Sequence, residues 1–466
     1  MFIDSLKSIV GSKFVIEDRT QLSSYIEEAR GDFKSETCAL ISPKSTEETA
    51  AVVLECQKAG ISIVPQGGNT GLCGGAVSRQ DQIILNLSRM NKILTIDNVN
   101  DTLTVEAGCI LSTIQDFAKE HDRYFPLSLG AEGSCQIGGN LSTNAGGINV
   151  LRYGNVRDQV LGLEAVLANG EVWNGMTELR KNNTGYDLKN LLIGSEGTLG
   201  IITKAVLRLF PLPRQVETAF VALTDLESSL HLLANARADS GGALSSFELI
   251  PGLGIELAKR YIPGINNPLD SVPNWSVIMV YSSSSEEHDL QASLETTLSN
   301  AYESGILTDG VISQNELQTK QIWAIREGLR EAQTMEGIAF THDISVKVSQ
   351  VPELIKRATI DGEKIVPGVR VYPFGHVGDG NIHLSFLQPL KMDKNIFRSR
   401  KIEFRKLIFD IINELNGSFS AEHGIGLLRL NEMSLYKSPT EIRMMLKIKD
   451  ALDPEGILNP GKVVPR

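Results

Sequence analysis

A run of glycines directly after an apolar stretch most constrains what this chain can fold into. Residues 64–76 read VPQGGNTGLCGGA and follow the apolar residues ISI. Five glycines in thirteen residues disfavour both a helix and a continuing strand, so we expect a strand to end here in a loop. Glycine lets successive backbone N–H groups approach a ligand and point the same way, which suits a phosphate. The spacing is neither GxGxxG nor GxxxxGK[ST], so a turn and a phosphate site both remain open.

Two further glycine-rich segments favour a ligand over a simple turn. Residues 129–147 read LGAEGSCQIGGNLSTNAGG, and residues 191–209 read LLIGSEGTLGIITKAVLRL. Both lie beside residues whose apolar pattern predicts strands. One long ligand lying across several loops accounts for all three segments, and a dinucleotide has that shape.

The apolar periodicity mixes strands with helices. A helix is predicted over residues 45–60, with Ser45 as its N-cap and Gly60 as its end. Strands are predicted near residues 38–43, 61–68, 82–90, 94–108 and 161–173. Strands follow strands as well as helices, so the fold class is α+β layers and not a doubly wound sheet.

Histidines are unusually placed in the second half of the chain. Of seven histidines, two bracket the glycine-rich sequence GHVGDGNIH, at His376 and His383. A hairpin turn at Asp379–Gly380 would bring these two imidazoles opposite each other. With the carboxylate of Glu422, in SAEHGIG, they would make a usual catalytic metal set. The alternative is a pair of polar loop histidines and an exposed Glu–His pair.

The three glycine segments resemble the FAD-binding domain of the vanillyl-alcohol oxidase and p-cresol methylhydroxylase superfamily. The resemblance covers almost the whole chain. It implies that FAD is bound by Pro65, Gly67, Gly68, Asn69, Thr70, Gly71, Gly74, Gly130, Ser134, Gly138, Gly139, Thr143, Asn144, Gly147, Tyr153, Glu196, Gly200, Ile202 and Asn459. Some relatives attach flavin through a histidine of the first loop. Asn69 stands at that place here, and residues 1–120 hold no histidine, so we expect non-covalent FAD.

The sequences GHVGDGNIH and AEHGIG together resemble the flavin-dependent D-2-hydroxyacid dehydrogenases. The resemblance implies that His376, His383 and Glu422 hold a divalent metal, expected to be Zn²⁺, and that His423 is the catalytic base. It implies that Arg326, on a helix predicted from KQIWAIREGLREAQ, binds the substrate carboxylate. Asn381 is a further expected substrate contact.

Two positions depart from the pattern of the D-2-hydroxyglutarate enzymes in this family. Arg330 stands where those enzymes have threonine, and Thr341 stands where they have a lysine that binds the distal carboxylate. Arg330 is one helical turn from Arg326 and could take over that role. Loss of the lysine argues against D-2-hydroxyglutarate, but the resemblance still makes it the first substrate expected, with D-lactate or another 2-hydroxy acid second. A non-redox transferase of the same fold and a flavin-binding subunit without activity are further alternatives.

The remaining expectations concern organisation and partners. We expect an FAD-binding domain at 1–213, a substrate-binding cap with the metal site at 214–425, and a helical segment at 426–466 that returns to the first domain. The net charge of −11 argues against nucleic acid as a partner. No apolar run predicts a transmembrane helix, and the first residues carry Asp4 and Glu17, so the predicted location is cytoplasmic. Electrons would pass to a separate carrier, such as an electron-transfer flavoprotein, a quinone or a cytochrome. A homodimer is compatible with the sequence.

Overall fold

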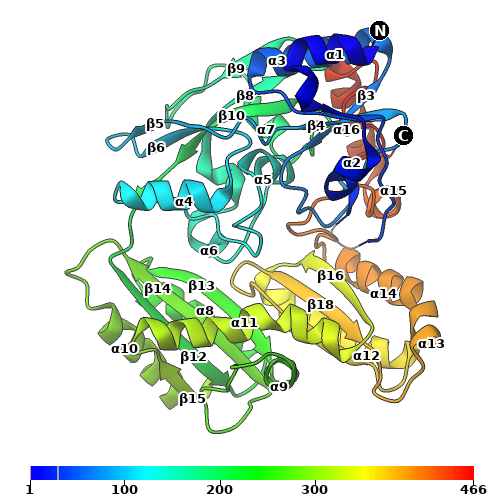
Figure 1. Cartoon of the computed structure of the whole chain (residues 1–466). Helices are drawn as coiled ribbons and strands as arrows, with labels where there is room; N and C mark the ends of the chain where they lie inside the picture. Colours follow the sequence, from blue (N-terminus) through cyan, green and yellow to red (C-terminus); the bar gives the residue numbers. More distant parts are fainter. Residues whose placement is uncertain (1, 29–30, 466) are drawn as a thin grey trace. The chain divides into compact units, whose positions relative to one another are not determined.

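The computed structural model describes residues 2–28 and 31–465, and the chain forms two compact units (Figure 1). Unit 1 comprises Met1–Gly146, Gly154–Leu212 and Glu422–Arg466, and unit 2 comprises Gly147–Tyr153 and Pro213–Ala421. Both units combine sheets with helices, which confirms the predicted α+β class. The predicted division at 213 and 425 stays a prediction, and the short segment 147–153 clusters with unit 2.

The first sheet of unit 1 carries the glycine loop at the end of one strand. Its order is β1–β2–β4–β3, from Val15–Ile16 (β1), Ala39–Ile41 (β2), Ser62–Gln66 (β3) and Gln82–Asn86 (β4). Strands β3 and β4 are parallel, and the crossover before β3 is helix α3, Thr46–Ala59. The Ser45 side chain accepts a bond from Glu48 N, and Gly60 ends the helix at φ 64°, as predicted.

The second sheet of unit 1 is antiparallel, with the order β5–β6–β10–β8–β9. Its strands are Ile93–Asp97 (β5), Thr102–Glu106 (β6), Val160–Val166 (β8), Val172–Gly175 (β9) and Ile201–Arg208 (β10). Helix α3 packs against both β3 and β8, so it joins the two sheets into one hydrophobic core. A short pair, Arg123–Tyr124 (β7) and Phe210–Pro211 (β11), lies outside both sheets. The other helices of this part are Phe2–Val10 (α1), Arg19–Ile26 (α2), Leu111–Glu120 (α4), Ile137–Thr143 (α5) and Lys189–Leu192 (α7).

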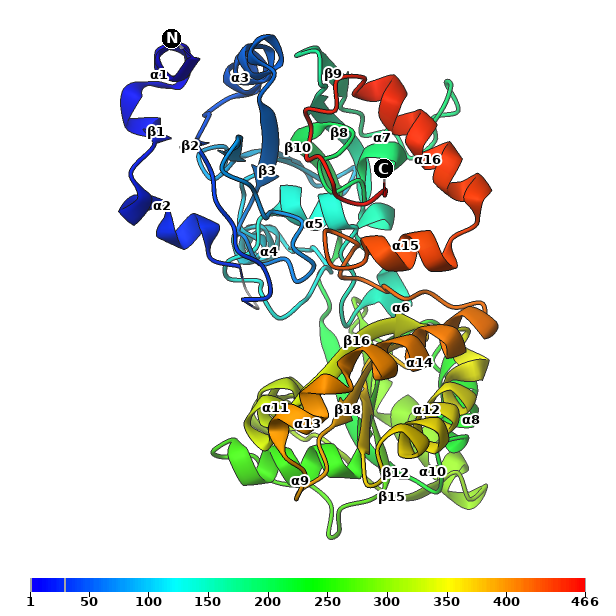
Figure 2. The same ribbon diagram turned by 90° about the vertical axis from the view of Figure 1, so that its right-hand side faces the viewer.

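The C-terminal segment of the chain packs on unit 1. It contains Leu430–Tyr436 (α15) and Pro439–Leu452 (α16), shown in red tones in Figure 2. Beyond α16, Leu458 forms a parallel bridge with Ile63 of β3. The buried Lys449 ammonium donates to the carbonyl oxygens of Leu458, at 2.8 Å, and Thr198, at 2.6 Å. These bonds hold the end of the chain against the strand that leads into the glycine loop.

Unit 2 holds two antiparallel sheets. The larger has the order β13–β14–β12–β15, from Gln215–Leu223 (β12), Leu244–Pro251 (β13), Trp275–Ser283 (β14) and Leu307–Ile312 (β15). The smaller has the order β16–β18–β17, from Ala339–Ser345 (β16), Arg370–Phe374 (β17) and Asn381–Leu387 (β18). A bridge between Leu249 of β13 and Gly375, just after β17, joins the two sheets.

Helices cover both sheets of unit 2. They are Val150–Tyr153 (α6), Ser228–Asp239 (α8), Gly252–Tyr261 (α9), Leu290–Glu303 (α10), Glu316–Glu336 (α11), Val351–Ile365 (α12), Lys394–Ser399 (α13) and Lys401–Glu414 (α14). Helix α11 packs against α9, and α14 packs against α12 and β16 (Figure 2). The predicted helix around Trp323 is thus confirmed, with Ile325 and Leu329 fully buried in α11.

Among the helices of residues 2–28 and 31–465, none combines the length and the apolar character needed to cross a membrane.

Candidate active site

The three glycine-rich segments meet in one cleft of unit 1. The cleft has a cavity volume of about 140 Å³ and opens to solvent. Its wall is formed by Glu28, Pro65–Val77, Leu87, Ala107, Cys135, Gln136, Gly138–Asn140, Ser142, Thr143, Glu196, Gly197, Gly200–Ile202 and His423. Segments far apart in sequence therefore line a single site, as binding of a dinucleotide across several loops requires.

Close backbone packing explains two of the glycines. A Cβ atom at Gly68 would lie 2.1 Å from the carbonyl oxygen of Ser134. A Cβ atom at Gly138 would lie 2.8 Å from the Ala107 side chain. Any larger residue at either position would push one wall of the cleft away from the next.

The polar side chains of the cleft suit a ligand rich in hydrogen-bonding groups. Gln136 Oε1 and Asn140 Oδ1 are buried and, within residues 2–28 and 31–465, have no hydrogen-bond partner. An orphaned buried oxygen is costly, and a ligand donor in the cleft would satisfy it. Together with the glycine loops of the wall, these residues fit FAD.

Most of the predicted FAD residues line the cleft. These are Pro65, Gly67, Gly68, Asn69, Thr70, Gly71, Gly74, Gly138, Gly139, Thr143, Glu196, Gly200 and Ile202. Gly130, Ser134, Asn144, Gly147, Tyr153 and Asn459 are not part of its lining. Gly147 and Tyr153 belong to unit 2, and the Asn459 amide donates to the carbonyl oxygens of Gly75 and Glu196 at 3.0 and 2.7 Å. A cofactor role for these six residues stays a prediction.

Glu196 connects the cleft wall to the loop that carries His423. Its carboxylate accepts a hydrogen bond from Ile425 N at 2.7 Å and from Gly426 N at 2.9 Å. Burial raises the pKa of Glu196 to about 7, against the lowering effect of these two backbone bonds. His423 itself lines the cleft. From the sequence, Glu196 was predicted only to contact FAD. In the structure, the Glu196 side chain also supports the backbone that follows His423, the predicted base.

The predicted hairpin between the two histidines is present in unit 2, with a different register. Strands β17 and β18 are antiparallel, but Phe374, and not His376, pairs with His383. The loop is longer than the expected two-residue turn, since the amides of both Asp379 and Gly380 donate to His376 O. The two imidazoles still lie close, with ring centroids 5.4 Å apart.

Glu422 completes a group of three side chains that could hold a metal ion. His376, His383 and Glu422 each offer one ligand atom, and these atoms lie within 4.8 Å of one another. Glu422 is bonded to Ala421, the last residue of unit 2, whose amide donates to Asp343 O at 3.3 Å. Two imidazoles and one carboxylate fit a catalytic zinc site, which keeps a position open for substrate.

A buried carboxylate that the sequence analysis did not identify lies beside these histidines. Glu248, on β13, is 1% exposed. Its Oε1 lies 2.5 Å from His376 Nδ1, and its Oε2 accepts a bond from Arg326 Nε at 2.7 Å. Burial alone would raise the pKa of Glu248, but His376 and Arg326 together outweigh it and lower the pKa to about 2. The sequence feature that could have revealed Glu248 is a glutamate inside the otherwise apolar stretch FELIP.

The predicted substrate residues are placed as follows. Arg326 stacks on Phe374, with its guanidinium carbon 4.9 Å from the ring centroid. Arg330 is exposed and lies one turn along α11. Asn381 is buried, and its amide donates to Asp343 Oδ1 at 2.9 Å and Ile344 O at 3.0 Å. Asn381 thus supports the hairpin through its amide.

Thr341, where the family pattern has lysine, takes part in a neutral hydrogen-bond network. Its hydroxyl accepts a bond from Gln333 Nε2 at 2.8 Å and one from Ser385 Oγ at 3.0 Å. Gln333 follows Arg330 on α11 by three residues, so the two side chains share a helix face. This network offers amide and hydroxyl groups but no cation.

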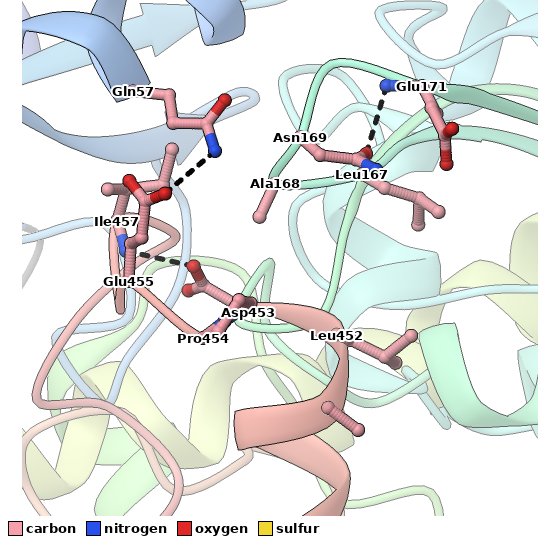
Figure 3. A pocket seen from close by; sticks show the side chains of 11 residues that line it. Gln57, Leu167, Ala168, Asn169, Glu171, Leu452, Asp453, Pro454, Glu455 and Ile457 are labelled. Atoms are coloured by element: carbon pink, nitrogen blue, oxygen red, sulfur yellow. Dashed lines mark hydrogen bonds between the residues drawn. The ribbon is translucent and has the colours of Figure 1, made fainter.

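A second cavity, of about 310 Å³, lies in unit 1 (Figure 3). Gln57 Nε2 donates to Glu455 Oε1 at 2.9 Å, and Asp453 accepts from Ile457 N at 3.0 Å. Lys449 forms an ion pair with Asp453. The three glycine-rich segments line the other cavity, so the glycine-lined cleft is the stronger candidate.

Comparison with known proteins identifies the family and the fold. Residues 38–175 match the FAD binding domain, and residues 212–463 match the C-terminal domain of FAD linked oxidases. Among solved structures, p-cresol methylhydroxylase aligns with a TM-score of 0.76 at 17% identity, covering 99% of this chain and 96% of that one. Alkyldihydroxyacetonephosphate synthase aligns with a TM-score of 0.73 at 18% identity, covering 98% of this chain and 84% of that one. The fold and the cleft therefore define an FAD-dependent oxidoreductase with a p-cresol methylhydroxylase-type FAD domain.

Full-length relatives show which family of FAD enzymes this chain belongs to. A probable mitochondrial D-2-hydroxyglutarate dehydrogenase of Oryza sativa subsp. indica is 41% identical over 466 residues, all of this chain and 82% of the relative. The mitochondrial D-2-hydroxyglutarate dehydrogenase of Arabidopsis thaliana is 39% identical, over 99% of this chain and 81% of its own. The D-2-hydroxyglutarate dehydrogenase of Stutzerimonas stutzeri is 34% identical, over 99% of this chain and 98% of the relative. The chain belongs to the D-2-hydroxyglutarate dehydrogenase family.

These relatives contradict the predicted cytoplasmic location. The similar proteins of rice, Arabidopsis thaliana and Danio rerio are named mitochondrial. The prediction rested on the lack of a long apolar run and on Asp4 and Glu17 near the start of the chain. The composition of one short segment does not determine where a protein acts.

Proposed function

We propose that the protein oxidises D-2-hydroxyglutarate to 2-oxoglutarate. The observation that carries the proposal is the arrangement in unit 2, where Arg326 and His376 are held by one buried carboxylate. It supplies a carboxylate anchor beside a candidate metal ligand, which is what a 2-hydroxy acid needs at its C1 end. The names of the full-length relatives support the choice of D-2-hydroxyglutarate.

Each side chain has a defined task in this proposal. Arg326 binds the C1 carboxylate through its two terminal nitrogens, since its Nε is bonded to Glu248. His423, which lines the FAD cleft, takes the hydroxyl proton on its imidazole as general base. When bound, FAD supplies the acceptor for the Cα hydrogen, which leaves as hydride, and a divalent metal held by His376, His383 and Glu422 supplies a Lewis acid for the substrate oxygens. Electrons then leave to a separate carrier.

D-lactate is the second candidate substrate, and the network around Thr341 favours it. Thr341, Gln333 and Ser385 present no positive charge for a distal carboxylate. In this proposal, binding of the distal carboxylate of a dicarboxylate substrate therefore depends on Arg330. The synthase among the solved neighbours shares the fold alone and gives no support to a transferase.

A substrate panel tests the proposal. Under anaerobic conditions, D-2-hydroxyglutarate should bleach the flavin absorbance of the holoenzyme faster than D-lactate does. A protein that D-lactate alone bleaches would leave D-2-hydroxyglutarate without support, and one that neither bleaches would refute the oxidation. Acid precipitation of the same sample should leave the yellow chromophore in the supernatant, because Asn69 replaces a linking histidine. Colour retained in the pellet would contradict non-covalent FAD.

A further inference from the structure

Glu248 is a charged residue in a strand that is otherwise part of the core. All eight residues of β13 are buried, and Glu248 pairs across the sheet with Ile278. A carboxylate in such a place costs several kcal/mol of desolvation unless both of its oxygens are paired. One oxygen of Glu248 is paired with His376 and the other with Arg326.

Backbone pairing fixes Glu248 against the loop that carries His376. Leu249 N donates to Gly375 O at 2.8 Å, and Gly375 N donates to Leu249 O at 3.1 Å. On the other side of Glu248, Gly378 N donates to Phe247 O at 3.2 Å. The residues flanking Glu248 are thus bonded to the residues flanking His376, which sets the distance between the two side chains.

Glu248 contacts Nδ1 of His376 and Nε of Arg326. These contacts do not use His376 Nε2 or the two terminal nitrogens of Arg326. A histidine whose Nδ1 faces a carboxylate must bind a metal through Nε2. An arginine held through Nε presents its two terminal nitrogens as a fork, the geometry that grips a carboxylate. Stability alone does not require this arrangement, since apolar residues of similar volume often stabilise a core as well as a buried ion pair does.

We propose that Glu248 is a positioning residue that orients the metal ligand His376 and the carboxylate anchor Arg326 at the same time. The inference rests on the proposed function, because it takes the roles of both partners from there. Glu248 supports both the substrate anchor Arg326 and the metal ligand His376. One substitution at Glu248 therefore weakens metal binding and substrate binding together.

The chain offers a matched control for this inference. Glu336, also in unit 2, is a carboxylate whose side chain is 3% exposed. It pairs with Arg370, with Arg260 at 3.3 Å and with Tyr261 Oη at 2.8 Å. Glu336→Gln disturbs an arginine–carboxylate cluster whose carboxylate is buried, without touching His376 or Arg326, so it reports the general cost of such a change.

The test measures zinc and product binding directly in the FAD-loaded enzyme. Glu248→Gln should lower the affinity for added zinc by about 10- to 100-fold, as loss of a carboxylate behind a histidine ligand does. It should also lower the affinity for 2-oxoglutarate by about tenfold, as measured by the change in flavin absorbance on binding. Glu336→Gln should leave both affinities within twofold, with an unfolding temperature lowered as much as in Glu248→Gln.

The outcomes separate this inference from the proposed function. Wild-type protein that binds no zinc or is not reduced by a D-2-hydroxy acid would refute the proposed function and the inference with it. Wild-type protein that does both, with Glu248→Gln unchanged in zinc and 2-oxoglutarate affinity, would overturn the inference alone. If Glu248→Gln does not fold, Glu248→Asp keeps the charge that Arg326 needs but is too short to reach both partners. It should still lose about tenfold in zinc affinity, and an unchanged affinity would overturn the inference.

Discussion

The carboxylate of Glu196 accepts a hydrogen bond from the backbone N–H of Ile425 at 2.7 Å, although the two residues are 229 positions apart. This bond, with the one from Gly426, ties the third glycine segment to the loop that follows His423. Both segments belong to unit 1, so the predicted base and the FAD cleft share one support.

Glu196 should make the stability of the protein depend on pH. Its folded pKa is raised from an ordinary 4.5 to about 7, mainly by burial. The folded state then holds a proton that the unfolded state has lost, so the free energy of unfolding falls as pH rises from 4.5 through 7. The loss should be about 3 kcal/mol, at ~1.4 kcal/mol per pKa unit. Glu196→Gln does not titrate and should remove this part of the slope in denaturant unfolding at pH 5 and pH 8. Parallel pH profiles of wild type and variant would contradict this assignment.

Gly68→Ala should weaken FAD binding. The new Cβ atom would lie 2.1 Å from Ser134 O, which forces two walls of the cleft apart. Overpacking of this kind costs about 1–3 kcal/mol, so FAD affinity should fall by about tenfold or more. Gly133→Ala is the control, because nothing lies within 4 Å of a Cβ atom there and the residue is next to the same contact. Equal FAD affinity of the two variants, measured by flavin fluorescence, would show that the close approach is not needed.

His383→Ala should release the metal while FAD stays bound. It removes one of three ligand side chains, whereas the FAD cleft is lined by unit 1 residues. Elemental analysis after dialysis should find metal in the wild-type protein and in His288→Ala, whose histidine is exposed. Metal retained at full stoichiometry in His383→Ala would rule out this ligand set.

Arg330→Ala should change substrate preference. Arg330 is exposed on α11, one turn from Arg326. We propose that it binds the distal carboxylate, which D-lactate lacks. Loss of a hydrogen bond to a charged group costs about 1.5–3 kcal/mol, so kcat/KM for D-2-hydroxyglutarate should fall about tenfold or more. D-lactate should be unaffected, whereas Arg326→Ala should damage both substrates. An equal loss for both substrates in Arg330→Ala would mean that Arg330 does not read the distal carboxylate.

Local patterns in the sequence were enough to predict the elements that carry the sites. The glycine segments, the N-cap at Ser45 and the long helix around Arg326 follow from glycine content, capping chemistry and helical periodicity, which act over a few residues. The hairpin near His383 was also predictable, but its register was not, because the backbone pairing of Gly375 with Leu249 shapes the loop from a distant strand.

The supporting carboxylates could not be predicted in this way. Glu248 lies 128 residues from His376, and Glu196 lies more than two hundred from Gly426. Their roles depend on which strands and loops the fold brings together, and no local pattern reports that. A charged residue inside an apolar strand was a visible sign of a buried partner, but it does not name the partner.

The most direct test of the central claim is an anaerobic titration of the FAD-loaded protein with D-2-hydroxyglutarate, followed by flavin absorbance. We expect full bleaching with one equivalent of 2-oxoglutarate formed per FAD, and slower bleaching in Arg326→Ala. Flavin that stays oxidised with excess D-2-hydroxyglutarate, in protein shown to hold both FAD and metal, would contradict it.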